Sequence, residues 1–315
     1  MKITILDGAT IGSDINLDEL KKFGEVEFYE TTFPTETKNR ISDSEIIITN
    51  KVVINEPEFE VAKKLQLVCV AATGYNNINI DAAKKHNVVV ANVKGYSTES
   101  VAQHVFANIL AFSNSVIDFN NQIKHNFWQQ SPIFTSLSFP VAELSGKNLG
   151  IIGYGSIGKR VAEIAKVFGM NILISARKNS TKIDLERLDF EEVVKKSDFL
   201  TIHCPLTKET ENLIAEKEFN MMKKSAIIVN TARGGIVNEK DLFYALKNKQ
   251  IRGAVVDVIS KEPPSDGNIL FNAPNILITP HIAWTSFEAR KKLVAGIISN
   301  IEDFLAGNID KIKIG

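Results

Sequence analysis

The chain has 315 residues, of which 44% are apolar and 23% are charged. It is therefore long enough for two domains with sizeable buried cores. Because 37 Lys and Arg residues balance 37 Asp and Glu residues, no net charge favours binding to nucleic acid or to a membrane, and a small molecule is the expected partner.

Cysteine content and hydropathy predict the compartment. Cys69 and Cys204 lie far apart in apolar, strand-like segments, which is neither a disulfide framework nor a metal-ligand cluster. No apolar run approaches the roughly 18 residues that span a bilayer. The N-terminal segment MKITILDG is typical of a strand and a turn, not of a signal peptide. We therefore expect a cytoplasmic protein with reduced cysteines and no metal.

The first 97 residues alternate short β-branched runs with amphipathic segments. Strands are expected at residues 3–6, 26–29, 45–49, 66–70 and 87–92. This alternation is typical of a buried parallel sheet with helices between its strands. The pattern predicts a first doubly wound α/β domain.

A long helix and an aromatic segment follow. Residues 98–124 carry apolar residues at helical spacing, which predicts one continuous helix. Residues 126–146 are rich in aromatic residues and are interrupted by Pro132 and Pro140. This segment has two possible interpretations, a loop packed on its own domain or an arm that clasps a second copy of the chain, since exposed apolar patches mark interfaces. The second interpretation predicts a homodimer.

A second β/α series begins near residue 149. Strands are expected at residues 149–153, 171–175, 199–204, 226–231, 253–258 and 276–280. Six strands with helices between them match a dinucleotide-binding doubly wound sheet. Residues 285–308 form another amphipathic helix, which is expected to return the chain to the first domain. The predicted domains are therefore residues 1–97 plus 286–315, for the substrate, and residues 98–285, for the dinucleotide.

A glycine-rich loop ends the first strand of this second series and opens a helix, the context in which G-x-G-x-x-G binds a dinucleotide. Its residues are Gly153, Tyr154, Gly155, Ser156, Ile157 and Gly158. The three glycines would permit a tight turn, backbone approach to the pyrophosphate and close packing of helix on strand, in that order. The phosphates would accept hydrogen bonds from the helix N-terminus, where the dipole favours negative charge. The alternative is a helix start that uses glycine only for packing.

The next strand runs into Ser175, Ala176, Arg177 and Lys178. An NAD site usually has an acidic residue at this strand end, roughly 20 residues after the loop, to bind the ribose hydroxyls. Here the acid is missing and two cations follow. This favours the 2′-phosphate of NADP, with NAD as the alternative cofactor. In the competing interpretation, Arg177 and Lys178 are solvated turn residues.

Three later segments place polar residues directly after apolar strands: residues 230–242, 253–264 and 278–286. Ligands of open α/β sheets bind at the carboxyl ends of the strands. Arg233, Asp257, Glu262 and His281 are therefore expected to converge there.

In these motifs the sequence resembles the D-isomer-specific 2-hydroxyacid dehydrogenase family over essentially the whole chain. The matching motifs are GYGSIG, HCPLTKET, NTARGGIVNE, DVISKEPP and TPHIAW, all in family order. Through ATGYNN, NVKGYST and PHIAW it is most similar to the glycerate dehydrogenase or hydroxypyruvate reductase group. The resemblance implies a flavodoxin-like substrate domain and a Rossmann dinucleotide-binding domain. It also implies reduction of hydroxypyruvate or glyoxylate with NAD(P)H.

By position, the resemblance makes Arg233 the ligand of the substrate carboxylate, His281 the acid/base and Glu262 the partner of His281. The chemistry of these side chains agrees with the roles. Histidine can give and recover a proton near neutral pH, and a neighbouring carboxylate favours the imidazolium and fixes the ring. Arginine offers a planar fork that binds a carboxylate bidentately.

Further positions follow from the same resemblance. It implies cofactor contacts, along with Arg233 and His281, from His203, Cys204, Pro205, Thr210, Thr231, Ala232 and Asp257, the last holding the nicotinamide carboxamide. It implies substrate contacts from Lys51, Ala72, Thr73, Gly74 and Trp284. Trp284 is either a wall that restricts the substrate side chain or a residue packed at the hinge. His86, His104 and His125 have no predicted role.

Two residues depart from the family pattern, namely Gln103, where many members have Glu, and Ala176, where the strand-end acid is usual. Within enzymes, the alternatives are a dehydrogenase for a bulkier 2-keto acid or for phosphoglycerate. Outside enzymes, the alternative is a dinucleotide-sensing co-regulator of the same fold, since fold alone does not determine function. The intact set of Arg233, Glu262 and His281 favours turnover.

Overall fold

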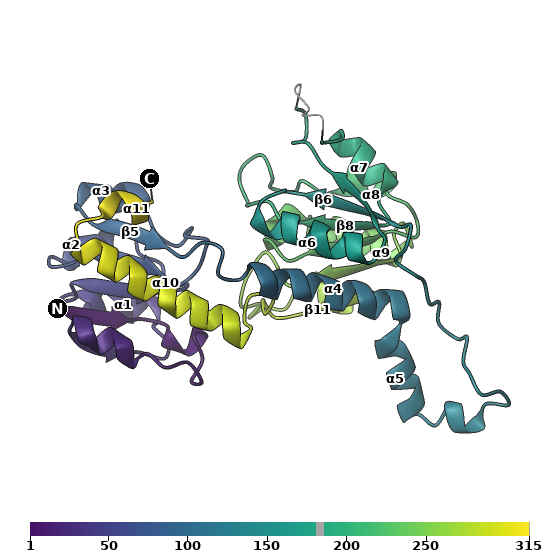
Figure 1. The fold of residues 1–315 in the computed structure, drawn as a ribbon, viewed down its shortest axis with the longest axis horizontal. Coiled ribbons are helices and arrows are strands. Elements are labelled where there is room, and N and C mark those ends of the chain that lie inside the picture. The colour runs from purple at the N-terminus through teal and green to yellow at the C-terminus, as the bar shows by residue number, and fades with distance from the viewer. Residues whose placement is uncertain (181–185, 315) are drawn as a thin grey trace. The chain divides into compact units, whose positions relative to one another are not determined.

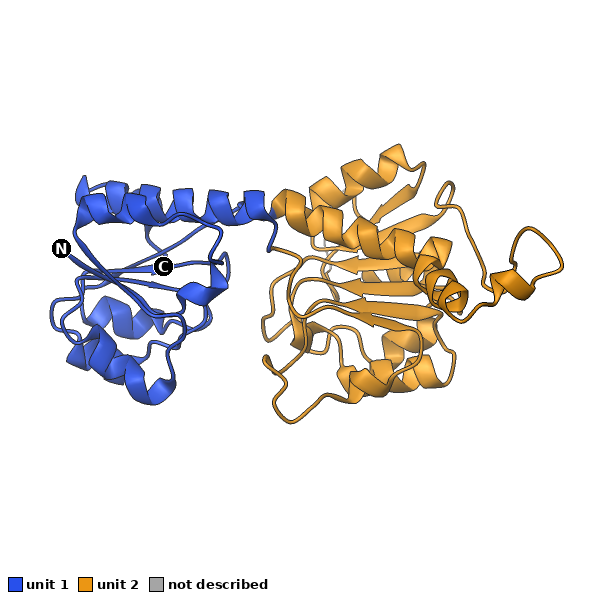
Figure 2. Cartoon of the chain, turned by 90° about the horizontal axis from the view of Figure 1, so that it is seen from below, with its two compact units in different colours: residues 1–97, 285–315 blue, residues 98–284 orange. Residues whose placement is uncertain are grey.

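The computed structural model describes residues 1–180 and 186–314. The chain divides into two compact units (Figure 2), unit 1 with Met1–Ser97 and Thr285–Gly315, and unit 2 with Thr98–Trp284. Unit 2 ends at residue 284, one residue before the end at residue 285 that the sequence predicted for the second domain.

Unit 1 is built on one parallel sheet in the order β2-β1-β3-β4-β5. Its strands are β1 (Lys2–Ile5), β2 (Glu25–Phe28), β3 (Ile46–Thr49), β4 (Leu67–Val70) and β5 (Val89–Asn92). Every residue of β3 and β4 is buried, as expected for a sheet covered on both faces. The order reverses between β1 and β3, so the loops after these strands lie at a topological switch point. The predicted flavodoxin-like sheet is confirmed.

Helices cover both faces of this sheet (Figure 2). They are α1 (Pro34–Ile41), α2 (Glu56–Val61), α3 (Ile80–Lys85), α10 (Phe287–Leu305) and α11 (Ile309–Ile312), with short 3₁₀ turns at Gly8–Thr10 and Asp18–Phe23. The long helix α10 begins after Ser286, whose side chain accepts the N–H of Ala289, as an N-cap residue does. Its buried residues recur at helical spacing, so the predicted C-terminal helix is confirmed.

Unit 2 contains a six-stranded parallel sheet in the order β11-β10-β9-β8-β6-β7. Its strands are β6 (Asn148–Ile152), β7 (Asn171–Ile174), β8 (Phe199–Ile202), β9 (Ile227–Asn230), β10 (Gly253–Val256) and β11 (Ile276–Ile278). An isolated parallel bridge joins Leu188 to Ser175 beyond β7. Leu188 thus takes the place of the third strand in the 3-2-1-4-5-6 order of a Rossmann fold. The predicted fold class is confirmed, and the bridge is the element that the sequence analysis missed.

The helices of unit 2 lie on both faces of its sheet, except α5, which extends away from the sheet (Figures 1 and 2). They are α4 (Thr98–Asn114), α5 (Val116–Lys124), α6 (Ser156–Val167), α7 (Phe190–Lys196), α8 (Glu216–Met221) and α9 (Glu239–Lys247), with 3₁₀ turns at Trp128–Gln130, Gly234–Ile236 and Ile269–Asn272. One core cluster joins the sheet to α4 and α6, and a second joins it to α7, α8 and α9.

The prediction of one continuous helix over residues 98–124 is wrong, because the helix breaks at Ser115. This residue adopts a left-handed backbone with φ 50°, which ends the regular α-helix. Its hydroxyl donates to the carbonyl of Pro140 at 2.8 Å, and the N–H of Ala142 donates to the carbonyl of Ser113 at 2.8 Å. The returning chain therefore donates to the carbonyl of Ser113, which would otherwise accept the next hydrogen bond of α4.

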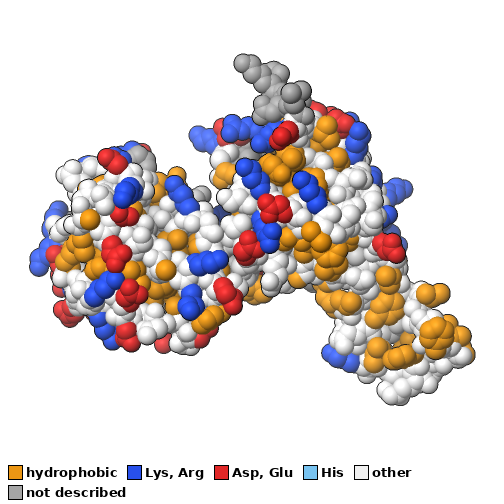
Figure 3. Space-filling model, in the orientation of Figure 1, with side chains coloured by type: hydrophobic (Ala, Val, Ile, Leu, Met, Phe, Trp, Pro, Cys, Tyr) orange, Lys and Arg blue, Asp and Glu red, His pale blue; other side chains and the backbone are white. Residues whose placement is uncertain are grey.

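We call residues 116–141 the arm. They comprise α5 and the loop that returns from it to Val141. Helix α5 has no buried residue. Most of the large apolar side chains of the arm are exposed, with Phe134 at 89% and Leu137 at 87%. Figure 3 shows the hydrophobic side chains gathered on it. Within the aromatic segment of residues 126–146, residues 127–141 contain no buried side chain, whereas Leu144 packs in the core of unit 2.

Both cysteines are free, with Cys69 buried and Cys204 partly buried. Burial raises the pKa of Cys69 to about 12 and that of Cys204 to about 11. Among the described residues, no helix is long and apolar enough to cross a membrane. Nor do the described residues bring three His, Cys, Asp or Glu side chains together as metal ligands.

Candidate active site

The glycine-rich loop joins β6 to α6 at the point where the strand order of unit 2 reverses. Gly153 has φ 92°, and a Cβ there would lie 2.6 Å from the backbone N of Cys204. A Cβ on Gly158 would lie 2.2 Å from the carbonyl oxygen of Gly153. Both glycines are therefore required by close backbone approaches, one between neighbouring loops and one within the turn.

Gly155 differs from the other two glycines, because a Cβ there would meet nothing within 4 Å. Gly155 is the N-cap of α6, and no side chain caps this helix. Within residues 1–180 and 186–314, the N–H groups of Gly155, Ser156 and Ile157 have no hydrogen-bond acceptor. An open space in front of unpaired N–H groups at a helix N-terminus fits the pyrophosphate of a dinucleotide.

The segment after β8 forms the opposite side of this loop. His203 donates its N–H to the carbonyl of Ile152 at 2.7 Å, and its ring nitrogen Nε2 lies 2.9 Å from the hydroxyl of Thr201. Burial lowers the pKa of His203 to about 3. The imidazole is therefore neutral near pH 7 and is bonded to its own strand, so the backbone of residues 203–205 is the part that can face a cofactor.

Two predicted cofactor residues use their hydroxyls locally. The hydroxyl of Thr210 donates to the carbonyl of Pro205 at 2.7 Å, which closes the loop after β8. The hydroxyl of Ser175 donates to the carbonyl of Ala176 at 2.7 Å. Both side chains shape their loops, and neither hydroxyl proton is left for a ligand.

At the end of β7, the two predicted cations have different surroundings. Arg177 is exposed. Lys178 turns inward, where its Nζ lies 2.8 Å from Oε1 of Glu218 and 5.3 Å from the centre of the Phe190 ring. Glu218 is only 1% exposed, and its other oxygen accepts the N–H of Ala215 at 3.1 Å. Lys178, which was predicted to contact the cofactor, thus neutralises a buried carboxylate.

His281 and Glu262 meet as predicted. Nδ1 of His281 lies 2.6 Å from Oε2 of Glu262, and Oε1 of Glu262 accepts the N–H of Ile259 at 3.0 Å. The Glu262 carboxylate is thus fixed by its own loop, and it fixes the ring of His281. Because a carboxylate only accepts hydrogen bonds, Nδ1 carries a proton and Nε2 is the atom left for a substrate.

Arg233 follows β9, and Asn230 holds its loop. Asn230 is 1% exposed; its side chain accepts the N–H of Ala232 at 3.0 Å and donates to the carbonyl of Arg233 at 2.8 Å. Nη1 of Arg233 donates to the carbonyl of Ala232 at 2.7 Å. A Cβ on Gly234 would lie 2.0 Å from the backbone of Ile259. The Arg233 loop therefore packs directly on the loop that carries Glu262.

Asp257 does not present a free carboxylate. It is 1% exposed, and it accepts the N–H groups of Ile282 and Ala283 at 2.8 and 2.9 Å and the hydroxyl of Thr279 at 2.5 Å. His104 lies behind Thr279. Burial lowers the pKa of its imidazole, whereas the charge of Asp257 acts in the opposite direction and raises it. Asp257, the predicted holder of the nicotinamide carboxamide, therefore also binds the loop around His281.

Thr231 carries a buried hydroxyl at the carboxyl end of β9. Its Oγ1 is buried and has no hydrogen-bond partner among the described residues. A buried hydroxyl without a partner is rare in folded proteins. Its position at the carboxyl end of β9, beside Ala232, fits the predicted cofactor groove.

The predicted substrate residues of unit 1 follow β3 and β4. The N–H of Lys51 donates to the carboxylate of buried Asp7 at 2.6 Å. Thr73 is held from β5, since its carbonyl accepts the side-chain amide of Asn92 at 2.6 Å and its hydroxyl donates to Val93. The N–H groups of Thr73 and Gly74 have no acceptor in the part of the chain that the structure describes. Such a turn can bind a carboxylate.

Sequence reasoning missed three positioning residues, namely Asn230, Glu218 and His104. Asn230 stands in the NTARGG motif, so its place before Arg233 was a usable signal. Glu218 and His104 lie in ordinary amphipathic helices, where nothing in the pattern marks a buried polar partner. Trp284, the last residue of unit 2, is partly exposed.

Comparison with known proteins agrees with this geometry. Residues 106–283 match the family model of the D-isomer specific 2-hydroxyacid dehydrogenase, NAD binding domain. A glycerate dehydrogenase of Methylorubrum extorquens is 37% identical over 97% of this chain and 96% of its own. A hydroxypyruvate reductase of Blautia hydrogenotrophica is 36% identical over 98% of both.

A solved structure extends the comparison to three dimensions. An acyclic imino acid reductase in complex with NADPH and D-Arg superposes with a TM-score of 0.86 at 30% identity, covering 98% of each chain. Because the family model matches more than half of the chain and relatives are 36–37% identical over nearly all of it, the chain belongs to the D-isomer specific 2-hydroxyacid dehydrogenase family.

Proposed function

We propose that this oxidoreductase reduces a small 2-keto acid, hydroxypyruvate or glyoxylate, to the corresponding 2-hydroxy acid, D-glycerate or glycolate. The observation that carries the proposal is the pair of His281 and Glu262, joined at 2.6 Å on the unit that matches the NAD-binding family model. The names of two relatives, a glycerate dehydrogenase and a hydroxypyruvate reductase, support the substrate class.

The reaction needs a hydride at the carbonyl carbon and a proton at the carbonyl oxygen. The reduced nicotinamide, when bound, supplies the hydride. His281 donates the proton from Nε2, and Glu262 stabilises the imidazolium before the transfer through Nδ1–H. In the reverse direction the neutral ring of His281 recovers the proton from the hydroxyl.

Arg233 binds the substrate carboxylate and polarises the adjacent carbonyl. One guanidinium N–H of Arg233 donates to the carbonyl of Ala232 at 2.7 Å. This hydrogen bond fixes the orientation of the planar group. The remaining N–H groups form the fork that a carboxylate accepts. Within unit 1, Lys51 and the N–H groups of Thr73 and Gly74 are proposed substrate contacts.

The test of this function is a panel of 2-keto acids assayed with NADPH and NADH. We expect hydroxypyruvate or glyoxylate to give the highest kcat/KM, above pyruvate, branched keto acids and phosphohydroxypyruvate. If Trp284 is the wall of the pocket, Trp284→Ala will raise the relative activity on branched keto acids. A flat profile across the panel, or no turnover with any member, would overturn the substrate assignment.

For the cofactor we propose NADP over NAD, through Arg177. Ala176 leaves no carboxylate at the strand end to bind ribose hydroxyls or to repel a phosphate, and Arg177 is exposed there. Lys178 is committed to Glu218 at 2.8 Å. Selectivity for the 2′-phosphate is therefore assigned to one cation, not two.

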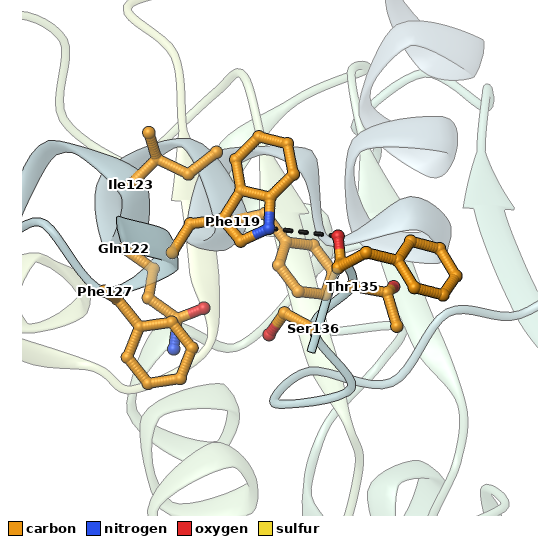
Figure 4. Close-up of a pocket in the computed structure, with 8 residues that line it drawn as sticks. Phe119, Gln122, Ile123, Phe127, Thr135 and Ser136 are labelled. Atoms are coloured by element: carbon orange, nitrogen blue, oxygen red, sulfur yellow. Dashed lines mark hydrogen bonds between the residues drawn. The ribbon is translucent and has the colours of Figure 1, made fainter. Parts of the chain in front are cut away.

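The arm is proposed to dock on a second copy of this chain, which gives a homodimer. The arm contains an open groove of about 280 Å³. Figure 4 shows side chains that line it, among them Phe119, Phe127 and Thr135. The indole of Trp128 donates to the carbonyl of Phe134 at 3.1 Å and holds the loop against α5. An ordered arm with exposed aromatic side chains fits an apolar partner surface. Two free thiols support a reducing, cytoplasmic location.

A further inference from the structure

The loop Thr279–Ala283 is wrapped around one buried carboxylate. The N–H of His281 donates to the backbone carbonyls of Asp257 at 2.8 Å and of Thr279 at 3.0 Å. The next two N–H groups along the loop donate to the carboxylate of Asp257. His281 itself has φ 54°, a left-handed conformation that a non-glycine residue keeps only where its surroundings hold it. The geometry of His281 therefore depends on Asp257.

Asp257 is in turn held from α4, through Thr279. The hydroxyl of Thr279 donates its proton to Oδ1 of Asp257 at 2.5 Å, and Nε2 of His104 lies 3.1 Å from the same hydroxyl oxygen. Since the only proton of that hydroxyl is used on Asp257, the oxygen can only accept from His104. His104 is therefore protonated at Nε2, and the three side chains form a directed chain of hydrogen bonds.

Helix α4 contacts the loop a second time. The hydroxyl of Ser100 donates to the carbonyl of Ala283 at 2.7 Å. Ser100 and His104 stand four residues apart, so they lie on the same face of α4. One face of this helix thus holds both ends of the loop that carries His281.

We propose that His104 and Thr279 are positioning residues that hold Asp257, and through it His281, in the geometry for proton transfer. This inference rests on the proposed acid/base role of His281. Neither side chain touches substrate in the proposed reaction. Their effect is on the placement of His281, and a misplacement of about 1 Å can lower a rate roughly a hundredfold.

Two pairs of variants of the full-length chain test the inference. Thr279→Val removes the hydroxyl at nearly constant shape, and Thr279→Ser keeps it. His104→Phe removes the donor, and His104→Gln keeps an N–H at a similar position. Asn114→Ala is the control, since its amide donates only to Leu110 within α4. Initial rates give kcat and KM for hydroxypyruvate, fluorescence titration gives the cofactor dissociation constant, and thermal melts report folding.

We expect Thr279→Val and His104→Phe to lower kcat by roughly tenfold to a hundredfold. KM and cofactor binding should change by less than about threefold, which is under 1 kcal/mol. Thr279→Ser, His104→Gln and Asn114→Ala should stay close to the unmodified enzyme. Unchanged kcat in Thr279→Val and His104→Phe overturns the inference. So does a loss of kcat that the Ser and Gln variants share, because that is a general packing effect.

His281→Asn separates this inference from the proposed function. If His281→Asn keeps full turnover, the acid/base assignment fails whatever the other variants do. If His281→Asn abolishes turnover while Thr279→Val is normal, only the positioning inference fails.

Discussion

Nζ of Lys178 lies 2.8 Å from Oε1 of Glu218, a carboxylate that is 1% exposed at the start of α8. Of the two cations after β7, Lys178 therefore faces a buried carboxylate, whereas Arg177 faces outward. This difference predicts that cofactor selectivity and stability respond to different substitutions.

Arg177→Ala should lower the ratio of kcat/KM for NADPH to that for NADH by roughly tenfold to a hundredfold, because a charge-assisted hydrogen bond to the 2′-phosphate is lost. Steady-state kinetics with both cofactors measures the ratio. Lys217→Ala, which removes an exposed cation of α8 bonded to Glu191, is the control. A ratio at or below one in the unmodified enzyme would show that Arg177 points to solvent and that NAD is the cofactor.

Lys178→Met should instead reduce the free energy of unfolding by about 2 kcal/mol, because it leaves the buried carboxylate of Glu218 without a counter-ion. Urea denaturation at pH 7 measures the loss. The double variant Lys178→Met with Glu218→Gln should recover part of it, since no buried charge then remains. A single variant as stable as the unmodified protein would contradict the assigned role of the pair.

His281→Asn should lower kcat by roughly 10²- to 10⁴-fold with cofactor affinity retained, the range typical of a general acid. Glu262→Gln should lower kcat less, since the ring stays oriented but loses the charge that stabilises its imidazolium. His86→Asn disrupts a second pair of the same kind, in which Nε2 of His86 lies 2.8 Å from Glu56, and it should leave kcat unchanged. Equal losses in His86→Asn and His281→Asn would point to folding, not chemistry.

Acid should destabilise the cofactor-free protein through His203. Its pKa of about 3 in the folded state lies below the ordinary value of about 6.5 in the unfolded chain. The unfolded state therefore binds the extra proton first, and stability falls as pH drops from about 6.5 toward 3. Between pH 7 and pH 5 this contributes a loss of about 1 to 2 kcal/mol in the free energy of unfolding. Urea denaturation of His203→Gln should show a shallower pH dependence, and an identical slope would contradict the prediction.

Leu137→Glu should shift the protein toward monomer, because a charge on an 87% exposed apolar position of the arm would be buried unpaired in the proposed dimer. Light scattering after size-exclusion chromatography measures the mass. Phe33→Glu is the matched control, an apolar side chain of unit 1 that is 65% exposed and lies outside the arm. A monomeric unmodified protein, or equal dissociation by both variants, would refute the arm as the dimer contact.

The sequence was sufficient for the elements that repeat a strong pattern. Apolar β-branched runs predicted all eleven strands of the two sheets, and the strand-to-helix context identified the loop at Gly153. The convergence of His281 and Glu262 could be predicted because both follow strands of one sheet, and the family resemblance implied that they form a pair. Periodicity could not predict the break at Ser115, since the apolar spacing continues through it and the cause is a tertiary bond to Pro140. The bridge at Leu188 is a single pair, too short for an alternating pattern.

Residues whose side chains act at a distance were also beyond sequence reasoning. Whether Lys178 faces outward or inward depends on Glu218, which is 40 residues away along the chain. The contacts of Asp257 could not be predicted for the same reason, since its carboxylate accepts N–H groups of a later loop. Charge and position alone predict that such groups are available, and only packing shows that they are already occupied.

The left-handed backbone of His281 has a consequence for evolution and design. Glycine adopts φ near 54° without steric strain, whereas a side chain there costs on the order of 1 to 3 kcal/mol. A substitution to glycine at this position would therefore relieve strain while it removes the proposed proton donor. Selection for thermal stability alone would favour losing the side chain that the chemistry requires, so stability and activity oppose each other at this residue.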